Sequence, residues 1–187
     1  TGFTVRGIKG AVQTLTGNTS GLTGTLAIQG ISTLDGAGGS SGGLTLSGAG
    51  NNTFNNATNL FAIRGGKFTI DNTTNNLTNR FPTAATSGMI SFLGGSFELL
   101  GNSAGTAFTI GSGYATNTKA TAFNAGQNNI IINQPVGATG PTILTFGAGP
   151  TPASLRDQTR MTINFSSTGS GTLGASVTDP QIKYATA

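Results

Sequence analysis

The chain has 187 residues but contains no cysteine, no histidine and no tryptophan. Without cysteine it forms neither disulfide bonds nor thiolate metal sites. Three Gly-x-Ser-x-Gly matches occur at 38–42, 39–43 and 101–105. A serine nucleophile needs a base to activate it, and histidine is the usual one. These matches are therefore typical of Gly/Ser-rich sequence and do not indicate a serine hydrolase.

Charge is also scarce, because only 7% of residues are charged, against about 25% in an ordinary globular protein. The net charge is +4, and the nine basic residues are dispersed along the chain. Nucleic-acid binding would require basic residues gathered on one face, so we expect no nucleic-acid partner. No apolar run is long enough for a membrane-spanning helix, and we expect a protein that does not span a membrane. The chain starts at Thr1 with no signal peptide, so we expect a mature or excised segment.

In place of charge, the polar residues are 32 Thr, 17 Asn and 15 Ser, accompanied by 31 Gly. Threonine favours strands because it is β-branched, and Asn and Gly favour tight turns because both tolerate positive φ. No stretch has a sustained 3.6-residue apolar period. Hydrophobic residues make up 35% of the chain and occur in alternating clusters, which argues against disorder. The composition predicts an all-β fold.

One phrase occurs twice, as LFAIRGGKFTID at 60–71 and as MISFLGGSFELL at 89–100. Each copy is an alternating apolar stretch, a Gly-Gly corner and a second alternating stretch, which is typical of a chain coiled into stacked rungs. The corners are Gly65–Gly66 and Gly94–Gly95. Aligned residues are predicted to contact each other one rung apart and to form the core: Phe61, Ile63, Phe68 and Ile70 with Ile90, Phe92, Phe97 and Leu99, and Leu60 with Met89.

These patterns predict a β-solenoid with irregular loops, in which residues 1–41 form N-terminal rungs or an assembly segment and residues 42–187 form the repeat module of the same continuous domain. A rung of about 20–25 residues gives roughly seven to nine rungs and a stack about 35–45 Å long. Further strands are predicted at 25–30, 108–111, 128–134, 142–147, 161–166 and 181–185, and a strand, a turn and a second strand are predicted over 43–54. A short helical turn is plausible only at 151–160, where Thr151 and Pro152 resemble a helix start.

The acidic residues offer one candidate pair for carbohydrate chemistry, Asp71 and Glu98, which lie at outward positions of the two repeat copies. A glycosidase needs two carboxylates about 5–10 Å apart. Charges that alternate with core residues on a strand are more typical of a solvated strand face. No cluster suits a metal ion and no phosphate-binding motif is present. We therefore expect no catalytic residues, no metal and no cofactor, and a protein that is not an enzyme.

Two segments carry a resemblance to a known family. GGLTLSGAGNNTF at 42–54 and NLFAIRGGKFTI at 59–70 resemble the autotransporter-associated β-strand repeat, and similarity continues through NRFP at 79–82 to the closing segment at 173–187. The resemblance implies a right-handed parallel β-helix on the surface of a bacterium or secreted beyond it, with a role in adhesion or surface structure and no catalytic residues. The sequence departs from the family at 55–59, where NNATN replaces the usual Thr-Gly-Gly turn.

The sequence thus predicts a non-enzymatic structural module of an extracellular bacterial surface protein or fibre. Solenoid ends expose unpaired strand edges, so the predicted partner is the chain itself, through end-to-end association or strand addition. The alternative is an adhesin that binds glycans or a host surface. A more distant alternative is a β-helix enzyme that degrades polysaccharides, with Asp71 and Glu98 as its carboxylates.

Overall fold

The computed structural model describes residues 3–7, 11–17, 26–30, 42–49, 61–78, 80, 90–110, 122–146 and 161–184. In these ranges all regular structure is β-strand, which confirms the all-β prediction for this part of the chain. The helical turn predicted at 151–160 lies outside the described residues. The strands are β1 (Phe3–Gly7), β2 (Val12–Leu15), β3 (Leu26–Gly30), β4 (Gly43–Leu46), β5 (Phe61–Arg64), β6 (Lys67–Asp71), β7 (Ile90–Leu100), β8 (Thr106–Ile110), β9 (Ala122–Gln134), β10 (Thr142–Phe146), β11 (Met161–Gly169) and β12 (Gln181–Tyr184).

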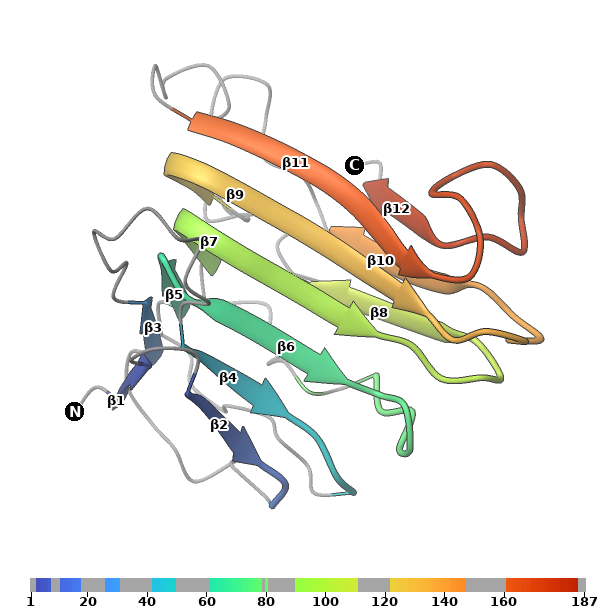
Figure 1. Cartoon of the computed structure of the whole chain (residues 1–187), viewed down its shortest axis with the longest axis horizontal. Coiled ribbons are helices and arrows are strands. Elements are labelled where there is room, and N and C mark those ends of the chain that lie inside the picture. The colour runs from blue at the N-terminus through green and yellow to red at the C-terminus, as the bar shows by residue number, and fades with distance from the viewer. Residues whose placement is uncertain are drawn as a thin grey trace, which may run out of the picture.

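The strands form two sheets whose ladders are all parallel. In the larger sheet the order is β1-β3-β5-β7-β6-β4-β2, with β9 paired to β7 and β11 paired to β9. The smaller sheet has the order β12-β10-β8. Figure 1 shows β2, β4, β6, β7, β9 and β11 stacked in this order, with the smaller sheet behind the upper part of the stack. β3 pairs with β5 and β2 pairs with β4. Strands from 1–41 and strands from 42–187 therefore belong to the same sheet.

We call each pass of the chain through the stack a rung. The six described rungs are β1 with β2, β3 with β4, β5 with β6, β7 with β8, β9 with β10, and β11 with β12. Partners in adjacent rungs are separated by 23 positions between Phe3 and Leu26 and by 38 between Ile143 and Gln181. The rungs are therefore mostly longer than predicted, because loops of different length join their strands. Five spacings of about 4.8 Å make the described stack about 24 Å tall.

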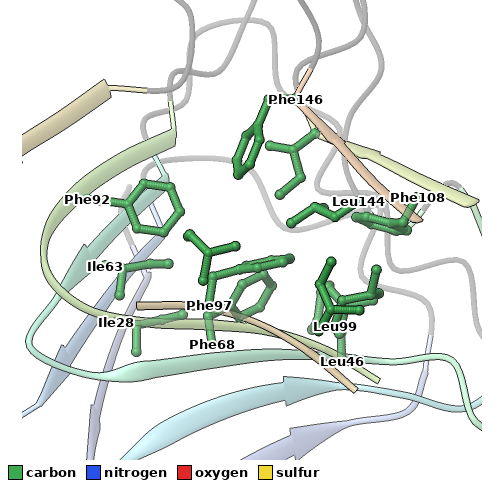
Figure 2. Close-up of a cluster of buried hydrophobic side chains, with 14 of the residues drawn as sticks. Ile28, Leu46, Ile63, Phe68, Phe92, Phe97, Leu99, Phe108, Leu144 and Phe146 are labelled. Carbon is green, nitrogen blue, oxygen red and sulfur yellow. The ribbon is translucent and has the colours of Figure 1, made fainter. Parts of the chain in front are cut away.

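The core lies between the two sheets and is lined by alternate residues of the strands. Figure 2 shows Phe68, Phe97 and Leu99 facing Phe108, Leu144 and Phe146 across this space, with Phe92, Ile63 and Ile28 at the curved side. All of these side chains have no exposed surface. Fully burying one such side chain stabilises the fold by about 1.5–3 kcal/mol. The apolar alternation in the sequence thus becomes a continuous interior.

Most strand predictions coincide with strands in the structure. Those at 25–30, 108–111, 128–134, 142–147, 161–166 and 181–185 fall on β3, β8, β9, β10, β11 and β12. The first strand predicted over 43–54 falls on β4, and the second lies outside the described residues. The sequence did not predict β1 or β2 as separate strands, because apolar residues alternate only weakly there. The first part of β9 was also not predicted, because AFNAGQ lacks an alternating pattern of apolar residues.

Candidate functional site

The structure pairs the two copies of the repeated phrase residue by residue, as the alignment predicted. Phe61 pairs with Ile90 and Ile63 with Phe92 between β5 and β7. Phe68 pairs with Phe97 and Ile70 with Leu99 between β6 and β7. The aligned pair Leu60 and Met89 lies outside the described residues, as do the side chains of Phe61 and Ile90. The other six side chains have no exposed surface: Ile63, Phe68, Ile70, Phe92, Phe97 and Leu99.

One row of this core passes through every rung of the described stack. The rings of Phe68 and Phe97 lie within it, with their centroids 5.8 Å apart and their planes tilted by 50°. This geometry is typical of favourable aromatic pairs. We call the row the central column; one residue comes from each rung, and its members in order are Gln13, Leu44, Phe68, Phe97, Ile130 and Phe165.

The Gly-Gly corners are stacked on one another and bring backbones close together. Gly65 N–H donates to the Gly94 carbonyl, and Ser96 N–H donates to the Gly66 carbonyl at 2.9 Å. A Cβ atom on Gly95 would lie 2.5 Å from the Gly66 carbonyl oxygen, and the φ of Gly95 is 128°. A side chain at this position would collide with the neighbouring backbone. The conformation and the close approach both require glycine.

A buried asparagine completes this corner in the next rung. The Asn128 side chain is fully buried and its Oδ1 accepts a hydrogen bond from Gly94 N–H at 3.0 Å. Its Nδ2 donates to the Gly126 carbonyl at 3.2 Å and to the Thr162 carbonyl at 3.3 Å. Asn128 therefore satisfies backbone groups of three successive rungs, where a corner interrupts the ladder.

The two acidic residues considered for catalysis have different structural partners. Glu98 Oε2 lies 2.7 Å from Lys67 Nζ on the neighbouring strand and accepts a hydrogen bond from Thr69 Oγ1 at 3.2 Å. Asp71 Oδ1 accepts from the backbone N–H of Thr73 at 3.0 Å and from its hydroxyl at 2.6 Å. Glu98 thus joins two rungs on the outer face, and Asp71 holds the turn that follows β6.

Each rung turns a second time after β4, β6, β7, β9 or β11, and we call this turn the second corner. In rung 3 it contains a buried arginine. Arg80 has no exposed surface, and its Nε donates to Asn72 Oδ1 at 2.7 Å. Its Nη2 donates to the carbonyls of Gly48 at 2.8 Å and Asn75 at 3.1 Å. Burial lowers the pKa of the Arg80 guanidinium below its ordinary value, and the Asp71 carboxylate opposes this shift. Arg80 therefore links the corners of rungs 2 and 3.

Polar side chains continue this second corner through the later rungs. Asn102 Nδ2 donates to the Thr73 carbonyl at 2.8 Å, and Asn76 Nδ2 donates to the Gly105 carbonyl at 2.7 Å. Further along, Gln134 Oε1 accepts from Thr142 N–H at 2.9 Å while its Nε2 donates to the Thr178 carbonyl at 3.0 Å. Asparagine and glutamine serve this role because each side chain both donates and accepts. This corner is a hydrogen-bonded stack of loops.

The ends of the stack differ from its middle in exposure. Among the described strands, β11 pairs only with β9, and β2 pairs only with β4. Phe165, the central-column residue of β11, is 38% exposed, and Val12 of β2 is 53% exposed. Gln13 and Thr14 are exposed as well. Within the described ranges no strand pairs with the outer side of β2 or β11, and apolar side chains are exposed beside both, so these two edges are the candidate functional site.

Sequence reasoning did not identify Asn128, Arg80, Asn72 or Gln134 as buried polar residues. Their positions depend on which loop stacks on which, and loop length varies from rung to rung. The one available signal was the placement of Asn72 immediately after the repeated phrase, at the start of a segment rich in Asn and Thr.

Comparison of the chain with protein-family models, curated proteins and solved structures found no match. The resemblance to the autotransporter-associated repeat thus stays a prediction. Within the described ranges, no three His, Cys, Asp or Glu side chains lie close enough together to hold a metal ion. The same part of the chain contains no helix long and apolar enough to cross a membrane.

Proposed function

We propose that the chain is a non-enzymatic structural module of an extracellular or cell-surface bacterial protein or fibre, and that it associates with itself through the ends of its stack. The observation that carries the proposal is the continuous central column. Its four middle members, Leu44, Phe68, Phe97 and Ile130, have no exposed surface, whereas Phe165 at the end is 38% exposed. Each rung covers the one before it, and the last described rung is left uncovered on its outer side.

The same proposal includes a right-handed parallel β-helix as the architecture. Every strand pairing in both sheets is parallel, so the chain must cross over between successive rungs. Crossover connections between parallel strands of one sheet are right-handed in about 98% of cases. The resemblance to a surface repeat family and the scarcity of charge are consistent with a role as a scaffold.

The test is the size of the particle as a function of concentration. Light scattering and negative-stain electron microscopy of the purified chain should show mass that grows with concentration and elongated particles. The variant Phe165→Lys should shift growth to higher concentration, because it places a charge at the end of the column. Lys183→Glu, a charge change at an exposed side chain of β12, is the matched control within the last rung. Monomers alone at every concentration would rule out self-association.

A second candidate function, binding of glycans or a host surface, has one supporting observation. The outer face of β9 and β11 carries amides and hydroxyls: Asn133 Nδ2 donates to Thr168 Oγ1 at 2.9 Å, and Asn164 and Thr162 are exposed beside them. Such groups are able to hydrogen-bond sugar hydroxyls. Binding on a glycan array that is lost in Asn164→Ala and Thr168→Ala would favour an adhesin, and an array without signal would argue against it.

A further inference from the structure

In the described part of the large sheet, β1, β2 and β11 each pair with one strand only, and the outer edges of β2 and β11 are complementary to each other. Among the described strands, β2 lies with β1 in the first rung and β11 lies in the last, and all pairings on the path from β2 to β11 are parallel. A second copy can therefore add its β2 to the β11 of the first copy with the polarity that successive rungs already have. The added contact continues the interface between rungs 5 and 6, and it joins two different surfaces. When such an interface repeats along the stacking direction of the rungs, it produces a linear assembly.

Neither edge strand has the features that proteins use to prevent such pairing. Exposed edges are normally blocked by charged residues, proline or a bulge. β11 reads MTINFSSTG and β2 reads VQTL, without charge or proline in either. The pairing of β11 with β9 runs through nine consecutive partners without a register shift. Both edges are thus suited to receive a further strand.

Register partners through the sheet determine how a second copy would align. Asn164 pairs with Asn129, which pairs with Ser96. Ser96 pairs with Lys67, Lys67 with Gly43, and Gly43 with Val12. Val12 and Asn164 thus hold the same position in the first and last described rungs. Repeating the sheet beyond β11 places Val12 of the next copy opposite Asn164.

We infer that copies of this chain join by pairing β2 of one copy with β11 of another in this register, which matches Val12 with Asn164, Gln13 with Phe165, Thr14 with Ser166 and Leu15 with Ser167. The inference rests on the proposed self-association and specifies its interface. The exposed Phe165 ring becomes covered by the next rung, and Leu15, already packed against the core of its own copy, approaches the end of the neighbouring core. The central column continues from one copy into the next.

Disulfide trapping tests this register directly because the chain contains no cysteine. One sample carries Val12→Cys and a cleavable tag that changes its mass, and the other carries Asn164→Cys. Both positions are exposed and share one face of the sheet by register. The two variants are mixed, oxidised and separated on a non-reducing gel. Circular dichroism of each variant establishes that the fold is retained.

Two matched variants, Thr162→Cys and Thr168→Cys, place the thiol at exposed positions of the same face and strand. Thr162 lies two residues from Asn164, about 7 Å along the strand, and reports a register slipped by one pleat. Thr168 lies two pleats in the other direction. A disulfide requires Cα atoms within about 7 Å of each other, so we expect at least ~10-fold more mixed dimer with Asn164→Cys than with either control.

The outcomes separate this inference from the function on which it rests. Equal or greater trapping with Thr162→Cys or Thr168→Cys overturns the register. Assembly in light scattering without a mixed disulfide overturns the β2–β11 interface but leaves self-association standing. An absence of both assembly and trapping overturns the inference and the proposed self-association together.

Discussion

The middle and the ends of the stack use the same strand geometry but have different surroundings. In the central column, Phe97 has no exposed surface, whereas Phe165, at the corresponding position two rungs later, is 38% exposed. Both are phenylalanines on long parallel strands. The difference arises because Phe97 has a rung on both sides and Phe165 has a described rung on one side only. Burial in this fold is therefore a property of the stack, not of the residue type.

The largest difference between middle and end should appear when each phenylalanine is truncated. Phe97→Ala leaves a cavity in the packed core and should lower the free energy of unfolding by about 3–5 kcal/mol. Phe165→Ala should lower it by about 1 kcal/mol or less, because part of the ring already contacts solvent. Urea denaturation of dilute samples measures both. Equal losses would contradict the comparison.

Arg80 extends the comparison to buried polar groups. Arg80→Met removes the donors to Asn72 Oδ1 and to the Gly48 and Asn75 carbonyls, and leaves these acceptors without that partner. We expect a loss of about 2–4 kcal/mol in the free energy of unfolding. Arg64→Met is the matched control, because Arg64 is exposed, and should change stability by about 0.5 kcal/mol or less. A loss as small at Arg80 would mean that its hydrogen bonds do not hold the two corners together.

Alanine substitutions at two glycines with positive φ distinguish the cost of backbone strain from the cost of a steric clash. Gly95→Ala should cost about 2–3 kcal/mol, because its Cβ would meet the Gly66 carbonyl at 2.5 Å. Gly137 has a φ of +75° with no neighbouring atom within 4 Å, so Gly137→Ala should cost only about 1 kcal/mol of conformational strain. Thermal unfolding of the two variants compares them. Equal costs would show that the stacked corner is less tightly packed than the structure indicates.

The smallest expected effect belongs to the ion pair on the outer face. Lys67 Nζ and Glu98 Oε2 lie 2.7 Å apart, and the lysine side chain is 40% exposed. A double-mutant cycle with Lys67→Met and Glu98→Gln should give a coupling energy of about 0.2–1 kcal/mol. The coupling should decrease with added salt, because exposed charges are screened. A coupling of several kcal/mol that persists in high salt would contradict a surface role for the pair.

The sequence predicted the parts of the fold that depend on short-range pattern. The pairing of Phe68 with Phe97 followed from the 29-residue repeat, because two copies of the same length align without knowledge of the loops between them. It did not predict that Asn128 stacks on the corner at Gly94, since this partner lies 34 positions away and follows a register shift in the ladder. Rung length was underestimated for the same reason. Where loop lengths vary, the sequence predicts the strands but not which residues of successive rungs pair with each other.

The sequence predicted that the candidate site consists of exposed strand edges, but it did not predict which strands form them. Exposed strand edges follow from any open solenoid, and end-to-end association was expected on that ground. Identification of β2 and β11 as strands of the first and last described rungs required the sheet order, and β2 lies in a segment where apolar residues alternate only weakly. Phe165 has the pattern of an ordinary inward residue in the sequence, because its exposure depends on the absence of a further rung beyond β11 among the described residues.

Hydrogen–deuterium exchange of peptide fragments, measured in dilute and in concentrated solution, tests the central claim most directly. The backbone amides of β6, β7 and β9 should be protected from exchange at both concentrations, because these strands are paired on both sides. Those of β2 and β11 should exchange faster in dilute solution and become protected on concentration, as each edge finds a partner. Two results would contradict self-association through the ends of the stack. In the first, the amides of β2 and β11 are as protected in dilute solution as those of the middle strands. In the second, their protection does not change with concentration.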